Sequence, residues 1–198
     1  MPYINQTTEG DANAPLIFTF HGTGGDEQQF HGLARDLLPE ATVISPRGDV
    51  SEQGANRYFR RSGEGVYDMV DLAQRVTRMA AFVTSAKAAR APACTIGLGY
   101  SNGANILAAV AFAHPALFDT MILLHPLIPF TPAPQPGLAG KRILITAGRH
   151  DPICPAPQTS TLADWLTAQG AGVEILWHDG GHEIGQAEIA ALPSFLAD

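Results

Sequence analysis

The amino-acid sequence predicts an α/β protein in which a mostly parallel sheet of about six to seven strands lies between two layers of helices. The chain has 198 residues, the size of one ordinary domain, so we expect residues 1–198 to form a single domain. Short apolar runs alternate with stretches of helical periodicity along its length. This alternation is typical of a three-layer α/β/α sandwich, whose sites lie beyond the carboxyl ends of the strands.

The expected strands are short and nearly continuous in apolar residues, as in strands buried on both faces. They are Pro15–Phe20, Ala41–Ser45, Cys94–Leu98, Thr120–Leu124, Arg142–Thr146 and Val173–Trp177. The expected helices are Glu27–Leu38, Tyr67–Ala89, Asn102–Ala113, Gln158–Ala168 and Glu183–Leu196. In the second helix, apolar residues between Met69 and Val83 recur at the spacing of one helix face. Two long connections, Pro46–Val66 and Pro126–Gly140, are predicted as loops.

Composition and charge argue against several classes of function. The chain carries 19 acidic and 12 basic residues, a net charge of −7, and its Lys and Arg do not gather into the basic face that binds nucleic acid. No apolar stretch approaches the roughly 20 residues that cross a bilayer, so no membrane association is expected. The opening residues lack the pattern of a secretion signal, so we expect a cytoplasmic protein with Cys94 and Cys154 reduced.

A glycine-flanked serine occupies the turn between an expected strand and an expected helix. The segment Gly99–Gly103 reads GYSNG, with Ser101 at its centre. In this G-x-S-x-G spacing the serine stands on a sharp turn that exposes its hydroxyl, and the glycines let strand and helix approach closely. The motif predicts Ser101 as a nucleophile. The alternative is a glycine-rich turn whose serine only caps the helix.

Candidates for a base and an acid follow the serine in chain order. A serine nucleophile needs a histidine within hydrogen-bond reach and a carboxylate that orients the histidine. Asp151 follows the strand Arg142–Thr146, and His182 follows the strand Val173–Trp177. Asp179 is a rival acid, but it lies too close to His182 in the chain to meet the correct ring nitrogen. The alternative roles are an Asx-turn at Asp151 and a helix cap at His182.

A second glycine-rich loop, His21–Gly25, follows the first apolar strand. Serine esterases use such a loop for one backbone N–H of the oxyanion hole, and the residue after the nucleophile supplies the other. The expected donors are therefore the amides of Thr23 and Asn102. A nucleotide-binding loop is the competing interpretation, but Glu27 stands where a third glycine is needed.

The remaining histidines do not form a convincing metal site. His178 and His182 are four residues apart, but two glycines intervene and no third ligand is evident, so no metal is expected. His21, His125 and His150 stand at expected strand ends, where we expect them to shape the cleft.

Together these motifs resemble the phospholipase/carboxylesterase family of the α/β-hydrolases, close to dienelactone hydrolase-like proteins and acyl-protein thioesterases. The segments that carry the resemblance are 21–25, 45–48, 57–61, 99–105, 148–152 and 181–182. The resemblance implies Ser101 as nucleophile, His182 as base, Asp151 as orienting acid, no cofactor and no cap domain. Dienelactone hydrolases carry cysteine in place of Ser101, which argues against their substrate here.

The segment Arg57–Arg61 has two interpretations. Its arginines bind an anionic leaving group, or they pair with acidic residues of neighbouring loops. Tyr58 and Phe59, together with Tyr100, are candidates for substrate contacts.

These observations lead to a serine carboxylesterase that hydrolyses small or short-acyl esters, with thioesters and lysophospholipids as further substrate classes. Its expected partner is a small-molecule ester, and a homodimer is left open. The alternative is a catalytically silent fold that serves as a small-molecule receptor or sensor.

Overall fold

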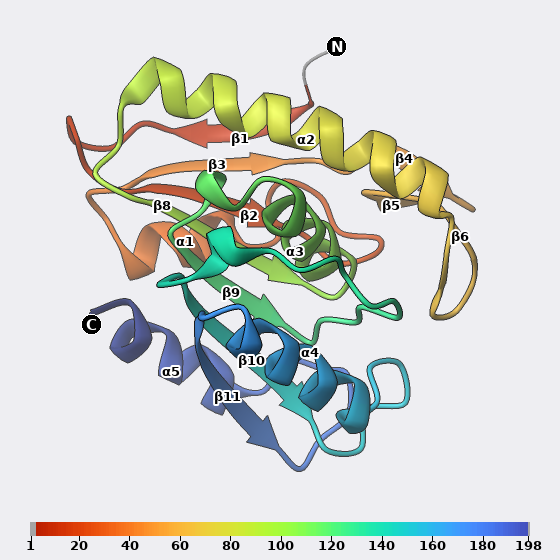
Figure 1. The fold of residues 1–198 in the computed structure, drawn as a ribbon. Coiled ribbons are helices and arrows are strands. Elements are labelled where there is room, and N and C mark those ends of the chain that lie inside the picture. Colours follow the sequence, from red (N-terminus) through yellow and green to blue (C-terminus); the bar gives the residue numbers. More distant parts are fainter. Residues whose placement is uncertain (1–2, 198) are drawn as a thin grey trace.

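The structure, a computed structural model, describes residues 3–197 and confirms the predicted α/β class. Seven strands form the central sheet, in the order β1-β3-β2-β8-β9-β10-β11 (Figure 1). All neighbouring pairs in this sheet are parallel except β1 and β3, which are antiparallel. The strands are β1 (Asn5–Thr8), β2 (Leu16–Phe20), β3 (Thr42–Pro46), β8 (Thr95–Tyr100), β9 (Thr120–Leu124), β10 (Arg142–Gly148) and β11 (Gly172–His178).

Helices cover both faces of this sheet. In β2, the side chain of Phe18 packs into a core cluster with α2, α3 and α4. The preceding residue, Ile17, points to the opposite face and packs into a cluster with α1. The α5 helix covers the α1 side farther along the sheet, through Leu192 and Phe195 (Figure 1). The helices are α1 (His31–Leu37), α2 (Met69–Arg90), α3 (Asn102–Ala113), α4 (Ala156–Ala168) and α5 (Gln186–Ala197).

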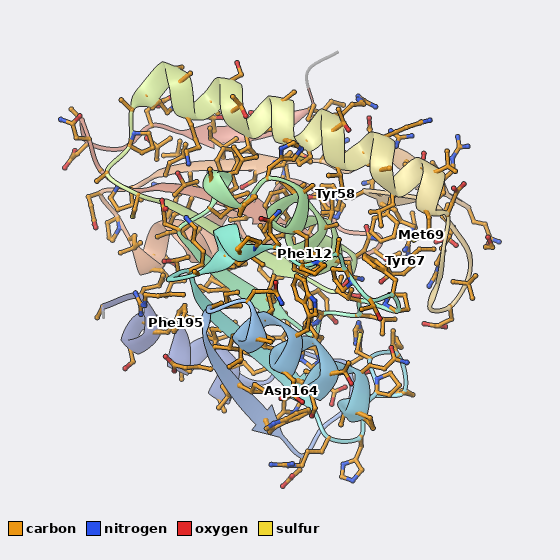
Figure 2. All side chains as sticks on the ribbon, viewed as in Figure 1. Tyr58, Tyr67, Met69, Phe112, Asp164 and Phe195 are labelled. Carbon is orange, nitrogen blue, oxygen red and sulfur yellow. The ribbon has the colours of Figure 1, made fainter. Side chains whose placement is uncertain are left out.

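Neighbouring helices on one face are joined by aromatic contacts. Phe112 of α3, labelled in Figure 2, packs edge to face on Trp165 of α4 with ring centroids 4.9 Å apart. The helical periodicity that predicted α2 is confirmed, since its apolar stripe from Leu72 to Val83 is buried. This helix begins after Asp68, whose carboxylate accepts hydrogen bonds from the amides of Val70 and Asp71.

The structure differs from the sequence prediction in its polar elements. The β1 strand was not predicted because its four residues, NQTT, are polar and mostly exposed. The connection after β3, predicted as a loop, contains two short hairpins: β4 (Val50–Glu52) with β5 (Ala55–Arg57), and β6 (Arg61–Gly63) with β7 (Val66–Tyr67). Two short 3-10 turns also occur: η1 (Pro115–Leu117) lies between α3 and β9, and η2 (Pro136–Leu138) lies in the connection between β9 and β10, which was predicted as a loop.

The parallel arrangement brings the segments that follow β2, β8, β10 and β11 to one edge of the sheet. These four segments contain the candidate residues Thr23, Ser101, Asp151 and His182. In the part of the chain that the structure describes, no helix has both the length and the apolar character needed to cross a bilayer.

Candidate active site

Ser101 stands on a strained turn between β8 and α3. Its backbone has φ 51° and ψ −116°, a left-handed conformation that a non-glycine residue rarely adopts. The amide of Ser101 donates a hydrogen bond to the Leu124 carbonyl at 2.9 Å, which ties the turn to the neighbouring β9 strand. The strain is therefore held in place by the sheet.

Gly99 and Gly103, on either side of Ser101, stand at positions where a side chain would not fit. A Cβ atom at Gly99 would stand 2.6 Å from the Gly103 carbonyl oxygen, and one at Gly103 would collide with the Phe20 carbonyl oxygen of β2. Both obstacles are backbone atoms, which cannot rotate aside. The strand and the helix approach as closely as they do only because both positions lack a side chain.

The structure brings Ser101, His182 and Asp151 into one hydrogen-bonded row. Ser101 Oγ lies 2.9 Å from His182 Nε2, and His182 Nδ1 lies 2.7 Å from Asp151 Oδ2. Since a carboxylate only accepts hydrogen bonds, Nδ1 carries the proton, and Nε2 is free to accept the hydroxyl proton of Ser101. The second oxygen of Asp151 accepts from the amides of Ile153 at 2.8 Å and Cys154 at 2.9 Å.

The surroundings keep Asp151 ionised. Burial opposes the negative charge, but hydrogen bonds from the Cys154 amide and from His182 outweigh it and lower the pKa of the Asp151 carboxyl. An ionised carboxylate at this point both orients the imidazole and stabilises its protonated form.

The rival acid, Asp179, points away from the row. Its side chain is 89% exposed, and its nearest charged partner is Arg149, at 3.5 Å. Its carbonyl oxygen lies 2.9 Å from Nδ1 of His150, in an exposed contact. His150 itself is exposed, which differs from the expectation that it shapes the cleft.

Two backbone amides next to Ser101 are free to donate. Among the described residues, neither the Thr23 amide nor the Asn102 amide has a hydrogen-bond acceptor. Asn102 is the first residue of α3, where backbone N–H groups have no partner within the helix. Thr23 and Asn102 both line the cavity that contains Ser101.

The β5 segment ties the two amide-bearing residues together. Arg57 Nη1 donates to Thr23 Oγ1 at 2.7 Å, and the Tyr58 amide donates to Asn102 Oδ1 at 2.8 Å. The preceding residue, Asn56, accepts a hydrogen bond from the Gly24 amide at 2.9 Å. The β4–β5 hairpin, which the sequence did not predict, therefore holds Thr23 and Asn102 in place beside Ser101.

A cavity of about 270 Å³ opens beside Ser101. Thr23, Tyr100 and Asn102 line it, as do several residues that sequence reasoning did not single out. The latter are Glu64, Gly65, Tyr67, Asn105, Leu127, Ile153 and Cys154. Tyr67 lies outside every motif, and Asn105 was given no role within the segment 99–105, so only the fold reveals their proximity.

Two of the three expected substrate contacts are wrong. Tyr58 and Phe59 are almost fully buried and do not line the cavity. The Tyr58 hydroxyl donates to the Pro46 carbonyl at 2.7 Å and accepts from the His21 amide at 3.1 Å, so it holds the loop from inside the core. Two aromatic residues within a polar loop fill the space between the hairpin and the sheet.

Tyr100 is placed beside the histidine of the row. Its hydroxyl donates to the His182 carbonyl at 2.8 Å, and the two rings lie 5.4 Å apart. Burial and the nearby Asp151 raise the pKa of Tyr100 to about 12, so the phenol keeps its proton and remains a donor.

Arg57 of β5 and Arg61 of β6 both pair with Glu52, and Arg61 also lies 3.8 Å from Glu64 Oε1. Glu52 lies 3.3 Å from Arg57 Nη1 and 3.0 Å from Arg61 Nε. Both arginines also line the cavity. Of the two interpretations of this segment, the geometry agrees with pairing to a neighbouring acidic side chain.

The fold and this row of side chains are those of the α/β-hydrolase class, and comparisons with known proteins identify the family. The Bacillus cereus carboxylesterase structure is 34% identical, with 98% of this chain and 93% of that chain covered and a TM-score of 0.89. Atu2452 from Agrobacterium tumefaciens, a protein of unknown function, is 52% identical over 98% of this chain and 96% of its own, with a TM-score of 0.93.

A curated relative agrees with the structural matches. MhqD of Bacillus subtilis (strain 168), named provisionally as a hydrolase, is 36% identical over 175 residues, or 87% of this chain and 88% of MhqD. No family model matches the chain. The chain belongs to the carboxylesterase family of the α/β-hydrolases, and its relatives support ester hydrolysis as its chemistry.

Proposed function

We propose that the protein is a serine carboxylesterase that hydrolyses small or short-acyl esters through an acyl-Ser101 intermediate. The observation that carries this proposal is the row in which Ser101 Oγ meets His182 Nε2 at 2.9 Å and His182 Nδ1 meets Asp151 at 2.7 Å. Hydrogen-bonded rows of this kind activate a serine hydroxyl toward carbonyl carbon.

In the proposed cycle, Ser101 Oγ attacks the ester carbonyl while His182 accepts its proton. The carbonyl oxygen becomes negative and receives hydrogen bonds from the amides of Thr23 and Asn102. His182 then gives its proton to the departing alkoxide, which leaves as the alcohol. Water, deprotonated by His182, hydrolyses the acyl-serine in a second passage through the same steps. This cycle requires no cofactor.

The size of the cavity supports a small acyl group. At about 270 Å³ it is slightly below the roughly 300–1,000 Å³ typical of sites for drug-sized ligands. Its walls combine the side chains of Leu127 and Ile153 with polar groups from Asn105 and Tyr67. The Tyr67 hydroxyl already donates to the Leu127 carbonyl, and the Asn105 amide donates to Tyr67, so these polar groups stabilise the wall itself.

The alternative function, a silent receptor, explains the cavity but not the row. A binding protein has no need of a serine held at φ 51° with its hydroxyl on a histidine. Such strain persists where it serves chemistry. The geometry therefore favours the enzyme.

The test is turnover of p-nitrophenyl esters with acyl chains of two, four, eight and twelve carbons, with matching acyl thioesters measured in parallel. We expect kcat/KM to be highest for the short acyl chains. Turnover that increases toward the long chains would contradict the small acyl site, and binding of esters without any turnover would favour the receptor.

A further inference from the structure

A second histidine, His125, contacts Asp151 from the protein interior, and a second carboxylate, Glu188, contacts His125 in turn. His125, the first residue after β9, places Nδ1 3.1 Å from Asp151 Oδ2 and Nε2 3.0 Å from Glu188 Oε1 on α5. The side chains of all three residues are 0% exposed. The proposed acyl-transfer cycle uses neither His125 nor Glu188. Buried charged groups that serve no packing need are costly, so their presence calls for a role.

Hydrogen bonding defines the protonation of this cluster. Each ring nitrogen of His125 faces a carboxylate, which can only accept, so both nitrogens donate and the ring is an imidazolium. Burial opposes this charge, but the hydrogen bonds to Glu188 and Asp151 outweigh it and raise the pKa of His125. Burial also opposes the charge of Glu188, yet the hydrogen bond from His125 helps to lower the pKa of that carboxyl.

We infer that His125 and Glu188 are positioning residues that hold Asp151 and set the proton affinity of His182, an inference that rests on the proposed function. Asp151 Oδ2 accepts from His182 at 2.7 Å and from His125 at 3.1 Å. With its other oxygen held by two backbone amides, the carboxylate has a single orientation. The positive charge of His125 beside Asp151 limits how strongly Asp151 favours protonated His182. Glu188 stabilises that positive charge in the interior.

His178 completes the cluster and argues against a metal there. Its Nε2 lies 3.3 Å from Glu188 Oε2, and its Nδ1 accepts from the Gly180 amide at 3.0 Å. Since Nδ1 accepts from this amide, the ring proton lies on Nε2. The ligand atoms of His125, His178 and Glu188 lie within 4.8 Å of one another, but a metal on Nε2 of His178 would require the ring proton on Nδ1, which instead accepts from the Gly180 amide.

Two other titratable groups that face His125, Tyr100 and Cys154, keep their protons and remain neutral. Tyr100 of β8 has its ring centroid 5.9 Å from that of His125, and the Cys154 thiol donates to the His125 carbonyl at 3.2 Å. Burial raises the pKa of Tyr100 to about 12 and raises the pKa of Cys154 well above its ordinary value. His182 faces His125 with ring centroids 5.3 Å apart. The charge of His125 is therefore balanced by Asp151 and Glu188.

The test compares the pH dependence of kcat/KM in the wild type and in Glu188→Gln. The variant removes one negative charge while nearly preserving the shape of the side chain. We expect His125 to become neutral and kcat/KM to fall about 10- to 100-fold, because the row loses its fixed geometry. The pH at half-maximal activity on the rising limb should increase by about 0.5–1 unit, because the positive charge beside Asp151 has gone.

A double variant and a control make the result decisive. His125→Asn with Glu188→Gln removes both charges together, which avoids an unpaired buried charge and should give the same shift of the rising limb. Asp179→Asn makes the same carboxylate-to-amide change on the exposed loop and should leave the limb in place. ¹⁵N NMR of the wild type should find both ring nitrogens of His125 protonated at neutral pH.

The outcomes separate this inference from the proposed function. An active wild type whose rising limb is unchanged in both Glu188→Gln and the double variant would make the pair a structural element only. A neutral His125 in the NMR spectrum would overturn the inference as well. A wild type that hydrolyses no ester would overturn the proposed function, and the inference with it.

Discussion

His182 and Asp151 are 31 residues apart in the chain, yet their side chains meet in a hydrogen bond of 2.7 Å. The contact forms because β10 and β11 are parallel neighbours, so the segments after them leave the sheet at the same edge. The Arg149 amide donates to the His178 carbonyl at 2.8 Å, and the His150 amide donates to the Gly180 carbonyl at 3.1 Å, which fastens the two segments together.

Asp151→Asn should reduce kcat of ester hydrolysis by about 10⁴-fold while KM changes little. An amide no longer orients the His182 ring in the tautomer that leaves Nε2 free, and it does not stabilise the protonated ring. Steady-state kinetics on a short-chain ester measures the effect. Asp179→Asn serves as the matched control and should be mild, because that side chain is exposed. A reversal, with Asp179 indispensable, would reassign the acid.

Prolonged treatment with EDTA should leave the rate of ester hydrolysis unchanged. The proposed nucleophile is activated by an imidazole, and both nitrogens of His182 are already engaged by Ser101 and Asp151. Metal analysis by mass spectrometry, carried out before and after chelation, accompanies the assay. A rate lost with EDTA and restored by zinc would contradict the assignment and give the histidines a role as ligands.

Gly103→Ala should destabilise the fold by about 1–3 kcal/mol or prevent folding altogether. The new methyl group meets the backbone of Phe20 and His21 at the end of β2, so relief requires moving a strand. Urea unfolding followed by circular dichroism measures the change. Gly32→Ala is the control, because nothing lies within 4 Å of a Cβ at that position. Equal stability of the two variants would mean that α3 and β2 are not packed as described.

The stability contributed by His125 and Glu188 should depend on pH. Glu188 has a lowered folded-state pKa, so its contribution is present above its ordinary value of about 4.3 and is lost as pH falls through the folded-state value. His125 has a raised folded-state pKa, so its contribution is present below about 6.5 and is lost as pH rises through the folded-state value.

The difference in melting temperature between the wild type and the double variant His125→Asn/Glu188→Gln should therefore be largest between about pH 4.5 and 6.5. Thermal unfolding measured at intervals from pH 3 to pH 9 tests this. A difference that stays constant over the whole range would show that the two side chains carry no paired charge.

Apolar patterning predicted the sheet and helices of this fold well. The bounds predicted for β9 and α3 agree with the structure, because their apolar residues are continuous and their neighbours are turn residues. Ser101, Asp151 and His182 were predicted because each follows an apolar strand, and parallel strands end at one edge of the sheet. A strong local motif and a simple topological rule were sufficient for these features.

Other features had no local signal. Polar β1 pairs with β3 through its backbone alone, and the hairpins of β4 to β7 are too short for any periodicity. Tyr58 and Phe59 were misjudged because burial depends on how the hairpin folds back onto β2 and β3. Glu188 is one acidic residue at the start of a helix, a common position, and only the tertiary fold shows it fully buried against His125.

The most direct test of the proposed mechanism is labelling with a fluorophosphonate followed by peptide mass spectrometry. One equivalent of reagent should attach to Ser101, abolish ester hydrolysis, and fail to react with Ser101→Ala, which should itself remain folded and inactive. Ser160→Ala, at an exposed position on α4, should label like the wild type. Labelling at another residue such as Cys154, or full ester hydrolysis by Ser101→Ala, would contradict Ser101 as the nucleophile.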